Sequence, residues 1–252
     1  MKKTILILFL FLMIVPILSL IAMSFERTNG IFFRWYVGIV RNEAFTSSLV
    51  LSLFVAVSSA FISTILSFAI SLAFFNKTQR IIVTFLIVIL GLLPSDILSL
   101  GINRLSLLLG LYNSNTILLF FGLILYCLPF CVLLFWIRYY FIDKSILIVA
   151  KDLGLNRLSI VIKILIPLTS LVLLSSLLFS FLLSFNEYTR SSYLSGSDVL
   201  LSEFLYGKLN SGTDPSIYAG GSLVIFITII FVSLLILFFR LQGKKRKGSG
   251  AI

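Results

Sequence analysis

Long stretches without a charged side chain constrain the fold of this chain more than any single motif does. They run over 4–25, 44–76, 105–137, 164–186 and 215–239, and a sixth, which begins at Ile81, contains only one acid, Asp96. A helix needs about 20 apolar residues to cross a bilayer, and it satisfies its own backbone hydrogen bonds in lipid. Because 60% of the residues are hydrophobic and only 12% are charged, the sequence predicts an all-α polytopic membrane protein with six transmembrane helices.

The predicted helices form a single transmembrane domain over residues 1–243. They lie at about 4–25, 46–75, 81–103, 114–138, 160–186 and 216–240, and a polar loop at 143–158 separates the fourth from the fifth. Lys2 and Lys3 precede the first run as in a secretory signal, but that run is long and no small-x-small cleavage site follows clearly, so it is kept as a membrane helix. Residues 244–252 are predicted to be a basic, flexible tail.

The distribution of Lys and Arg predicts the orientation. The N-terminus, the loops at 76–80 and 138–163 and the C-terminal tail hold 14 of the 20 Lys and Arg residues, and the opposite side holds 6. The positive-inside rule therefore places both termini and the 143–158 loop in the cytoplasm. The basic cluster at 244–247 directly follows a predicted membrane helix, which favours an orientation signal or a lipid contact over a nucleic-acid site.

Missing residue types exclude several kinds of catalytic site. The chain has no His, which removes the commonest general base and the Ser-His and Cys-His nucleophile pairs. It has no Gly-rich phosphate loop of the Walker type, so it is not expected to hydrolyse ATP itself. Cys127 and Cys131 lie one helical turn apart and are too few for a four-ligand metal site, so we predict that they are packing residues.

Small residues recur at helical spacing in the second and fifth predicted helices. The rows are Ser59, Ser63, Ser67 and Ser71, then Ser48, Ser52, Ala56 and Ala60, and then Ser176, Ser180 and Ser184. Side chains at i and i+4 share a face, and small residues let two helix backbones approach while hydroxyls bond across the interface. We predict helix packing, and a polar stripe that lines a pore is the alternative.

The 143–158 loop contains the segment that indicates a mechanism. It reads Ala150-Lys151-Asp152-Leu153-Gly154-Leu155-Asn156-Arg157, and Ile164-Leu165-Ile166-Pro167 follows at the fifth predicted helix. Glycine permits a sharp change of direction that strains a residue with a Cβ atom. The pattern predicts a short surface helix, a turn at Gly154 and a second helix that enters the membrane. This projection suits docking into a groove on another protein.

The segment resembles the cytoplasmic coupling loop of ABC importer permeases, whose pattern is Glu-Ala-Ala, three residues, Gly and, further along, Ile-x-Leu-Pro. The chain keeps Ala150, Gly154, Ile164 and Pro167 of this pattern. Ile148 and Val149 stand where the family usually has Glu and the first Ala. The salt bridge that this Glu makes with the ATPase is therefore in doubt.

The resemblance covers nearly the whole chain, and it looks most like the second permease of spermidine/putrescine-type importers. The matching segments are Trp35-Tyr36, Ser47-Ser48-Leu49, Pro94-Ser95-Asp96, Cys127-Leu128-Pro129-Phe130-Cys131-Val132, Leu183-Ser184-Phe185-Asn186-Glu187 and Ser191-Ser192-Tyr193-Leu194-Ser195-Gly196. The resemblance implies the type I ABC importer permease fold and a location in the bacterial inner membrane.

The resemblance also implies that this chain forms half of a pore. A second, homologous permease would complete the pore, two cytoplasmic ATPase subunits would dock on the coupling loops, and an extracytoplasmic binding protein would deliver substrate. A pore made of two copies of this chain stays open as an alternative. ATP and Mg²⁺ would bind to the ATPase, and no cofactor is expected on this chain. The expected coupling residues are Ala150, Lys151, Asp152, Leu153, Gly154, Leu155, Asn156, Arg157 and Pro167.

Polar residues near the predicted outer side are candidates for the substrate path. They are Asp96, Asn186, Glu187, Tyr188 and Tyr193. Asp96 falls in the outer half of the third predicted helix, where an ionisable group is a functional candidate, although it could instead reach the headgroups or cap a helix broken after Pro94. Glu187 and the two tyrosines could receive a cationic amine, although tyrosine is also a usual membrane-boundary residue.

A polyamine, spermidine or putrescine, is the expected substrate, and other solutes stay open. Asn186 replaces the first of the paired acids of the related permeases, and Arg190 adds a positive charge nearby. Both changes weaken the hold on a dication. The alternatives are a phosphonate, iron, thiamine or a sugar, and an anion is favoured if Arg104, Arg190 or Lys208 line the path.

Two other classes of protein stay as competing hypotheses. A six-span membrane enzyme or assembly factor would need convergent acids on its cytoplasmic loops, where the chain has only Asp143 and Asp152. A secondary transporter would usually be larger and show two related halves, and no internal repeat is visible.

Overall fold

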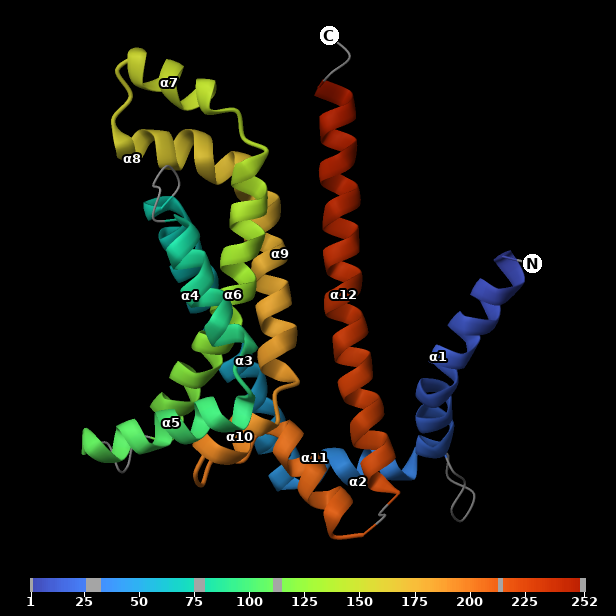
Figure 1. Ribbon diagram of the computed structural model, residues 1–252. Coiled ribbons are helices and arrows are strands. Elements are labelled where there is room, and N and C mark those ends of the chain that lie inside the picture. The colour runs from blue at the N-terminus through green and yellow to red at the C-terminus, as the bar shows by residue number, and fades with distance from the viewer. Residues whose placement is uncertain (1, 26–32, 75–79, 111–114, 213–214, 250–252) are drawn as a thin grey trace. The chain divides into compact units, whose positions relative to one another are not determined.

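The computed structural model describes residues 2–25, 33–74, 80–110, 115–212 and 215–249. Its helices are α1 (Lys2–Ser24), α2 (Arg34–Val40), α3 (Glu43–Ala73), α4 (Arg80–Leu92), α5 (Ser95–Leu108), α6 (Asn115–Tyr140), α7 (Lys144–Asp152), α8 (Arg157–Ile160), α9 (Ile166–Phe185), α10 (Thr189–Leu194), α11 (Leu201–Asn210) and α12 (Ser216–Ser249) (Figure 1). A π-helical turn, Val161–Leu165, precedes α9. The described residues contain no strand, so the predicted all-α fold class is confirmed for them.

Four helical stretches among the described residues are long and apolar enough to cross a membrane. They are Glu43–Ala73, Thr116–Tyr140, Arg157–Phe185 and Ser216–Phe238. The pair α4 and α5 adds a fifth if the two helices are counted as one broken span, and Phe11–Ser24 of α1 is a shorter apolar helix. These helices make the chain a multi-pass membrane protein.

The prediction of one continuous helix at 81–103 is wrong. The helix breaks between Leu92 and Ser95, and the axes of α4 and α5 differ by 100°. Pro94 lies at the break with φ of −53° and ψ of 135°. Proline has no N–H to donate to the preceding turn, and it disfavours helical geometry at the residue before it. Asp96 therefore lies in the first turn of α5 and not deep along a single helix.

The C-terminal end also differs from the prediction. α12 continues past residue 240 to Ser249, so residues 244–249 are helical where a flexible tail was expected. Lys, Arg and Gln are good helix formers, which explains how the basic segment extends the membrane helix. Residues 250–252, and the predicted helix limits at 75 and 114, lie outside the described residues.

The chain forms two compact units. The first comprises Met1–Ser52 and Val199–Ile230, and the second comprises Leu53–Asp198 and Phe231–Ile252. α3 and α12 contribute to both. The second unit contains all the predicted coupling residues and all the predicted substrate-path residues.

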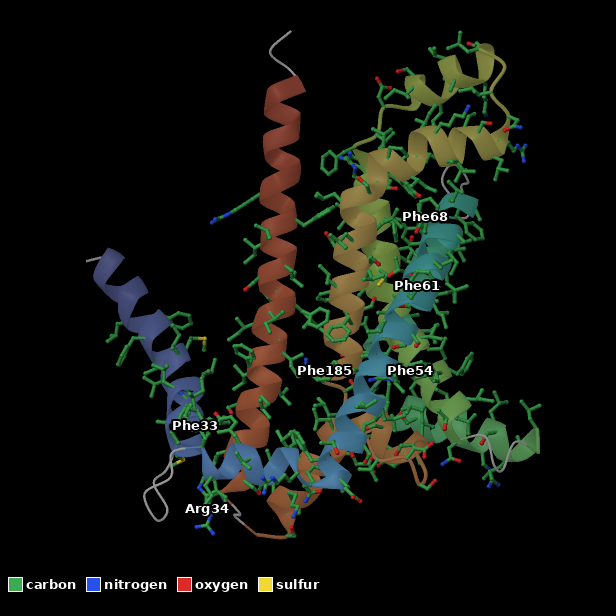
Figure 2. The ribbon with its side chains drawn as sticks, turned by 180° about the vertical axis from the view of Figure 1, so that it is seen from behind. Phe33, Arg34, Phe54, Phe61, Phe68 and Phe185 are labelled. Carbon is green, nitrogen blue, oxygen red and sulfur yellow. The ribbon has the colours of Figure 1, made fainter. Side chains whose placement is uncertain are left out.

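The apolar core of the second unit connects the membrane helices to the short helices α7 and α8. Phe135 and Trp136 of α6 are buried in it, and Ala150 and Ile160 extend it to α7 and α8. Phe68 lies on α3 (Figure 2). Its ring packs edge-on against that of Phe135, with ring centroids 5.5 Å apart. The segment between α6 and α9 is therefore anchored on the core of this unit.

Hydroxyl and thiol groups hold α3, α6 and α9 together in the second unit. The Oγ atoms of Ser59 and Ser184 lie 2.9 Å apart, and Cys131 Sγ lies 2.7 Å from Ser180 Oγ. These side chains are buried, as is Cys127, and both cysteines are free thiols. Small side chains let the three backbones approach. The packing interpretation of the serine rows and of the two cysteines is confirmed.

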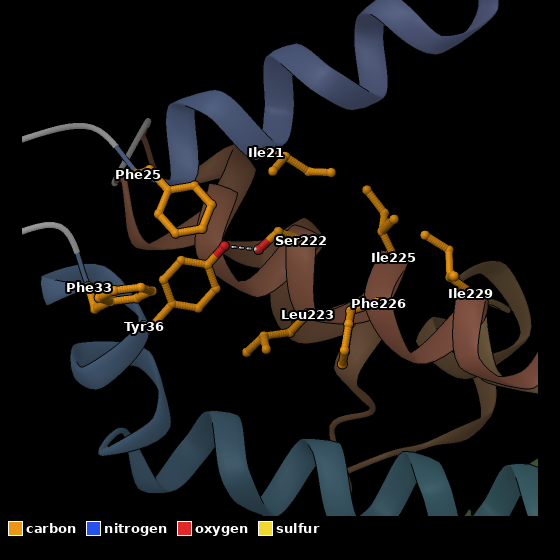
Figure 3. A pocket seen from close by; sticks show the side chains of 9 residues that line it. All are labelled: Ile21, Phe25, Phe33, Tyr36, Ser222, Leu223, Ile225, Phe226 and Ile229. Carbon is orange, nitrogen blue, oxygen red and sulfur yellow. Dashed lines mark hydrogen bonds between the residues drawn. The ribbon is translucent and has the colours of Figure 1, made fainter.

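In the first unit, Tyr36 joins three helices. Its hydroxyl lies 2.7 Å from Ser24 Oγ of α1 and 2.7 Å from Ser222 Oγ of α12. Tyr36 and Ser222 also line a cavity of about 260 Å³ (Figure 3). Its lining is otherwise apolar and consists of Ile21, Phe25, Phe33, Leu223, Ile225, Phe226 and Ile229.

Candidate functional site

The segment between α6 and α9 begins with a capped helix. Asp143 precedes α7, and its carboxylate accepts a hydrogen bond from the backbone N–H of Ser145 at 2.9 Å. This bond satisfies one of the donors that are left open at the start of a helix. It also favours the charged carboxylate and so lowers the pKa of Asp143 below its ordinary value. The local sequence thus determines where α7 begins.

Gly154 turns the chain at the end of α7. Its φ is +79°. The N–H of Gly154 donates to the carbonyl of Lys151 at 2.9 Å, and the N–H of Leu155 donates to the carbonyl of Ala150 at 3.1 Å. This pair of bonds is the Schellman arrangement, in which a left-handed glycine closes a helix. A Cβ atom on Gly154 would meet nothing within 4 Å, so the backbone conformation, and not a lack of space, favours glycine here.

Asn156 starts the second helix of the segment. Its Oδ1 accepts a hydrogen bond from the N–H of Ser159 at 2.7 Å, which caps α8. α7 and α8 run side by side beyond the ends of α6 and α9 (Figure 1). From Arg157 the chain continues as one apolar helical stretch to Phe185. The predicted order of short helix, glycine turn and membrane-entering helix is therefore present.

The two faces of α7 differ in exposure. Ala150 is only 4% exposed and packs in the core, whereas Ile148, Val149 and Leu153 are 59%, 55% and 76% exposed. Leu158 of α8 is exposed as well. We call Ile148, Val149, Leu153 and Leu158 the α7–α8 apolar surface. An apolar surface on a short polar-flanked projection is the kind of patch that marks a protein contact.

The charged coupling candidates are exposed around this surface. They are Lys151, Asp152 and Arg157. All the coupling candidates except Pro167 lie in one continuous segment, which consists of α7, the turn that follows it and the start of α8. The sequence alone does not tell which of Ala150 and Val149 is buried, since both are small apolar residues in one short helix.

An irregular turn marks the start of α9 near Pro167. The π-helical turn ends at Leu165, and Pro167 lies in the first turn of α9. Proline cannot donate a backbone hydrogen bond, and single π-turns of this kind often occur at functional positions. Arg138, near the end of α6, donates through Nε and Nη2 to the carbonyl of Leu168, at 3.1 and 2.9 Å. The end of α6 and the start of α9 are thereby tied together where α7 and α8 project.

At the other end of α9, Glu187 is paired within the chain. Its Oε1 lies 2.9 Å from Nη1 of Arg190, and the two side chains are 11% and 4% exposed. The Arg190 guanidinium lies over the ring of Tyr126, 3.9 Å from the centroid. The spacing of Glu187 and Arg190 could have predicted the ion pair, because residues three apart on a helical turn are neighbours. No local pattern predicts the contact with Tyr126, which belongs to α6.

The remaining candidates after α9 are Asn186, Tyr188 and Tyr193. Asn186 ends α9, and its Nδ2 donates to the carbonyl of Leu182 at 2.9 Å. Tyr188 is half-buried ahead of α10, and Tyr193 is partly exposed with its carbonyl 3.4 Å from Nδ2 of Asn103 in α5. The ring that the Arg190 guanidinium lies over belongs to Tyr126, which was not among the predicted site residues.

Asp96 occupies the start of α5. Its side chain is exposed, and it stands in the first turn of the helix, where the positive end of the helix dipole favours an acid. The alternative that Asp96 supports a helix broken after Pro94 fits this position. A role for Asp96 in the substrate path stays a prediction.

Comparison with known proteins finds similar sequences among transport-system permeases and a similar fold in an ABC transporter. No protein-family model matches the chain. It is 27% identical over 245 residues to the spermidine/putrescine transport system permease protein PotC of Shigella flexneri, covering 94% of this chain and 91% of the relative. It is 24% identical over 226 residues to the putrescine transport system permease protein PotI of Escherichia coli K12, covering 83% and 80%.

A solved structure shares the fold. It is the crystal structure of a bacterial ABC transporter involved in the import of the acidic polysaccharide alginate, with a TM-score of 0.71 over 96% of this chain and 93% of that one. The identity is 14%, so this likeness concerns the fold alone. The predicted resemblance to importer permeases, and to the second permease of spermidine/putrescine transporters in particular, is confirmed.

Proposed function

We propose that this chain is the permease subunit of an ATP-driven importer and forms half of the translocation path for a polyamine, spermidine or putrescine. The relatives are permease proteins of polyamine transport systems and match this chain nearly end to end. The observation that carries the proposal is the projection of α7 and α8, which is capped at both starts, turned by Gly154 and packed on the core through Ala150. Such a projection can transmit a movement because it is rigid within itself.

In this proposal the chain crosses the bacterial inner membrane six times, with both termini in the cytoplasm. The crossings are α1, α3, the broken pair α4 and α5, α6, the stretch from α8 to α9, and α12. α7 then lies in the cytoplasm, and α2, α10 and α11 lie outside. The excess of Lys and Arg in the segments assigned to the cytoplasm supports this orientation.

The partners follow from the resemblance. A homologous permease would supply the other half of the pore as a heterodimer, two cytoplasmic ATPase subunits would bind ATP and Mg²⁺, and an extracytoplasmic protein would deliver the polyamine. The residues proposed to contact or orient the ATPase are Ala150, Lys151, Asp152, Leu153, Gly154, Leu155, Asn156 and Arg157, with Pro167 at the start of α9. This chain supplies the path and the coupling element, and the ATPase supplies the hydrolysis.

Closure of the ATPase dimer would displace α7 and α8 as one body. Ala150 and Ile160 pack in the core, and Arg138 ties α6 to the start of α9. A push on the projection would therefore reach α6 and α9 together, which is the rigid-body motion that alternating access requires. The contact itself would be largely apolar, because Ile148 and Val149 stand where the related permeases have Glu and Ala.

The importer complex, purified through this chain from its native membrane, provides the test. We expect ATPase activity that rises when a binding protein loaded with spermidine or putrescine is added. Gly154→Asp is expected to abolish that stimulation while the chain still inserts and assembles. A complex without ATPase activity would overturn the importer assignment.

Another small solute is the second candidate for the same permease. Asn186 is uncharged, and the carboxylate of Glu187 is shared with Arg190, so this end of α9 offers less negative charge than a pair of free acids. ATPase activity that does not respond to polyamines would favour this candidate and leave the importer assignment in place.

Asp96→Asn tests the role of Asp96 in the substrate path. Unchanged uptake of a polyamine by this variant would show that Asp96 is structural.

A further inference from the structure

A buried cluster in the second unit combines an ion pair with a cation–π contact. It combines Glu187 after α9, Arg190 in α10 and Tyr126 in α6. Glu187 Oε1 accepts two hydrogen bonds from Arg190, one from Nη1 at 2.9 Å and one from the backbone N–H at 3.2 Å. The Tyr126 ring covers the guanidinium at 3.9 Å.

A carboxylate beside the face of an aromatic ring is a binding site for an organic cation. The carboxylate supplies a charge-assisted hydrogen bond, and the ring supplies a cation–π contact that is stronger when water is excluded. A primary ammonium group needs the same two partners. Glu187 and Tyr126 are therefore placed as an ammonium group would need them, and Arg190 occupies that position.

Arg190 fills this site incompletely. Its side chain is buried, yet Nε has no hydrogen-bond partner among the described residues. A guanidinium has five N–H donors, and a buried donor without a partner destabilises the state that contains it. Displacement of Arg190 from the cluster would relieve this deficit, provided another cation then satisfies Glu187.

The charge of the cluster limits the replacement to one positive group. Asn186 contributes no charge, so Glu187 is the single negative group of this stretch, and Arg190 neutralises it. An ammonium group that replaces Arg190 leaves the local charge unchanged. A second ammonium on the same substrate would find no second acid here.

We propose that Arg190 is a specificity-determining residue: a tethered cation that occupies the Glu187–Tyr126 site and yields it to one ammonium group of the substrate. The proposal rests on the proposed polyamine function, because it assigns one contact of that substrate. Arg190 thereby lowers the apparent affinity of the path for amines, since only molecules with a vacated site bind them.

Direct amine binding to the purified importer complex, without binding protein, tests this proposal. Spermidine and putrescine are titrated while the thermal stability of the complex is followed. Arg190→Gln is expected to bind spermidine about tenfold more tightly than the unmodified chain if Arg190 fills the site in about nine of ten molecules. Arg190→Lys keeps a cation and is expected to stay near the unmodified affinity. Arg41→Gln, which removes an exposed cation at the end of α2, is the matched control and is expected to change nothing.

Equal or weaker spermidine binding by Arg190→Gln would overturn the proposal and leave Arg190 as a structural strut. If Arg190→Gln does not assemble because Glu187 is left unpaired, the double variant Glu187→Gln with Arg190→Gln removes both charges. That variant is expected to bind spermidine about tenfold more weakly than the unmodified chain, because the charge-assisted hydrogen bond to Glu187 is lost. Unchanged affinity would overturn the proposal. A complex whose ATPase ignores polyamines altogether would instead refute the polyamine function itself.

Discussion

The turns that follow α7 and α9 both redirect the chain between two helices, but they are held in different ways. After α7, Gly154 takes a positive φ and Asn156 caps the next helix, so every bond that shapes the turn is made within a few residues. After α9 there is no glycine, and Asn186 has a φ of −95°. That turn is held by the buried pair Glu187 and Arg190 and by a ring from another helix.

The difference fits the tasks proposed for the two turns. A turn whose hydrogen bonds are local keeps its shape when its neighbours move, which suits an element that transmits a push. A turn held by a buried charge pair responds to any ion that competes for one partner, because an unpaired charge in a low-dielectric setting is costly. The first turn is therefore suited to coupling and the second to sensing a charged solute.

Glu187→Gln is expected to have the largest effect and would break the charge-held turn. It leaves Arg190 buried without its charge partner, and removing one partner of a buried pair costs about 3–5 kcal/mol. The measurement is thermal unfolding of the purified complex together with amide exchange over residues 188–195. Glu43→Gln, an exposed acid in the first turn of α3, is the control and should cost at most about 1 kcal/mol. Equal stability of the two variants would show that the pair does not hold this turn.

Ala150→Leu and Val149→Leu form a matched pair for the turn after α7. Ala150 packs against the core, so added methylene groups are expected to cost about 1–3 kcal/mol and to displace α7. Val149 is exposed, and its substitution should stay within about 0.5 kcal/mol. Stability and stimulated ATPase activity are measured for both. A loss of stimulated ATPase activity for Val149→Leu would place the ATPase contact on the α7–α8 apolar surface. Unchanged stability of Ala150→Leu would show that Ala150 has no structural role.

The two turns also differ in how far the sequence predicts them. Gly154 and the short helix before it follow from local patterns, as do the long apolar helices, because spacing and glycine act within a few residues. A helix broken after Pro94 was only an alternative at the sequence level, because the run from Ile81 is also long enough for one unbroken span. Tyr126 could not be assigned to Glu187, since contacts between separate helices depend on how those helices pack.

Gly154→Ala sharpens the local half of the comparison. A residue with a Cβ atom is strained at a φ of +79° by about 1–2 kcal/mol, while a Cβ atom there meets no neighbour, so the effect isolates backbone strain. Amide exchange at Leu155, whose N–H bonds to the carbonyl of Ala150, is the measurement. Gly154→Asn should lose less, because asparagine tolerates the left-handed conformation. Similar losses for both variants would point to a need for open space and not for a particular backbone conformation.

The smallest expected effect is the pH dependence of the Asp143 cap. Its pKa is lowered from an ordinary value of 3.8 because Ser145 donates a hydrogen bond to the charged carboxylate. A group whose pKa is lowered by folding contributes its full stability above the unfolded-state pKa and loses it as the pH falls through the folded-state value. Protection of the Ser145 amide from exchange should therefore be constant above about pH 5 and decline below the ordinary value. Asp143→Asn keeps a capping oxygen but does not titrate, so its protection should be flat across this range. A decline of the same size in both variants would assign the change to other acids and leave the start of α7 independent of this carboxylate.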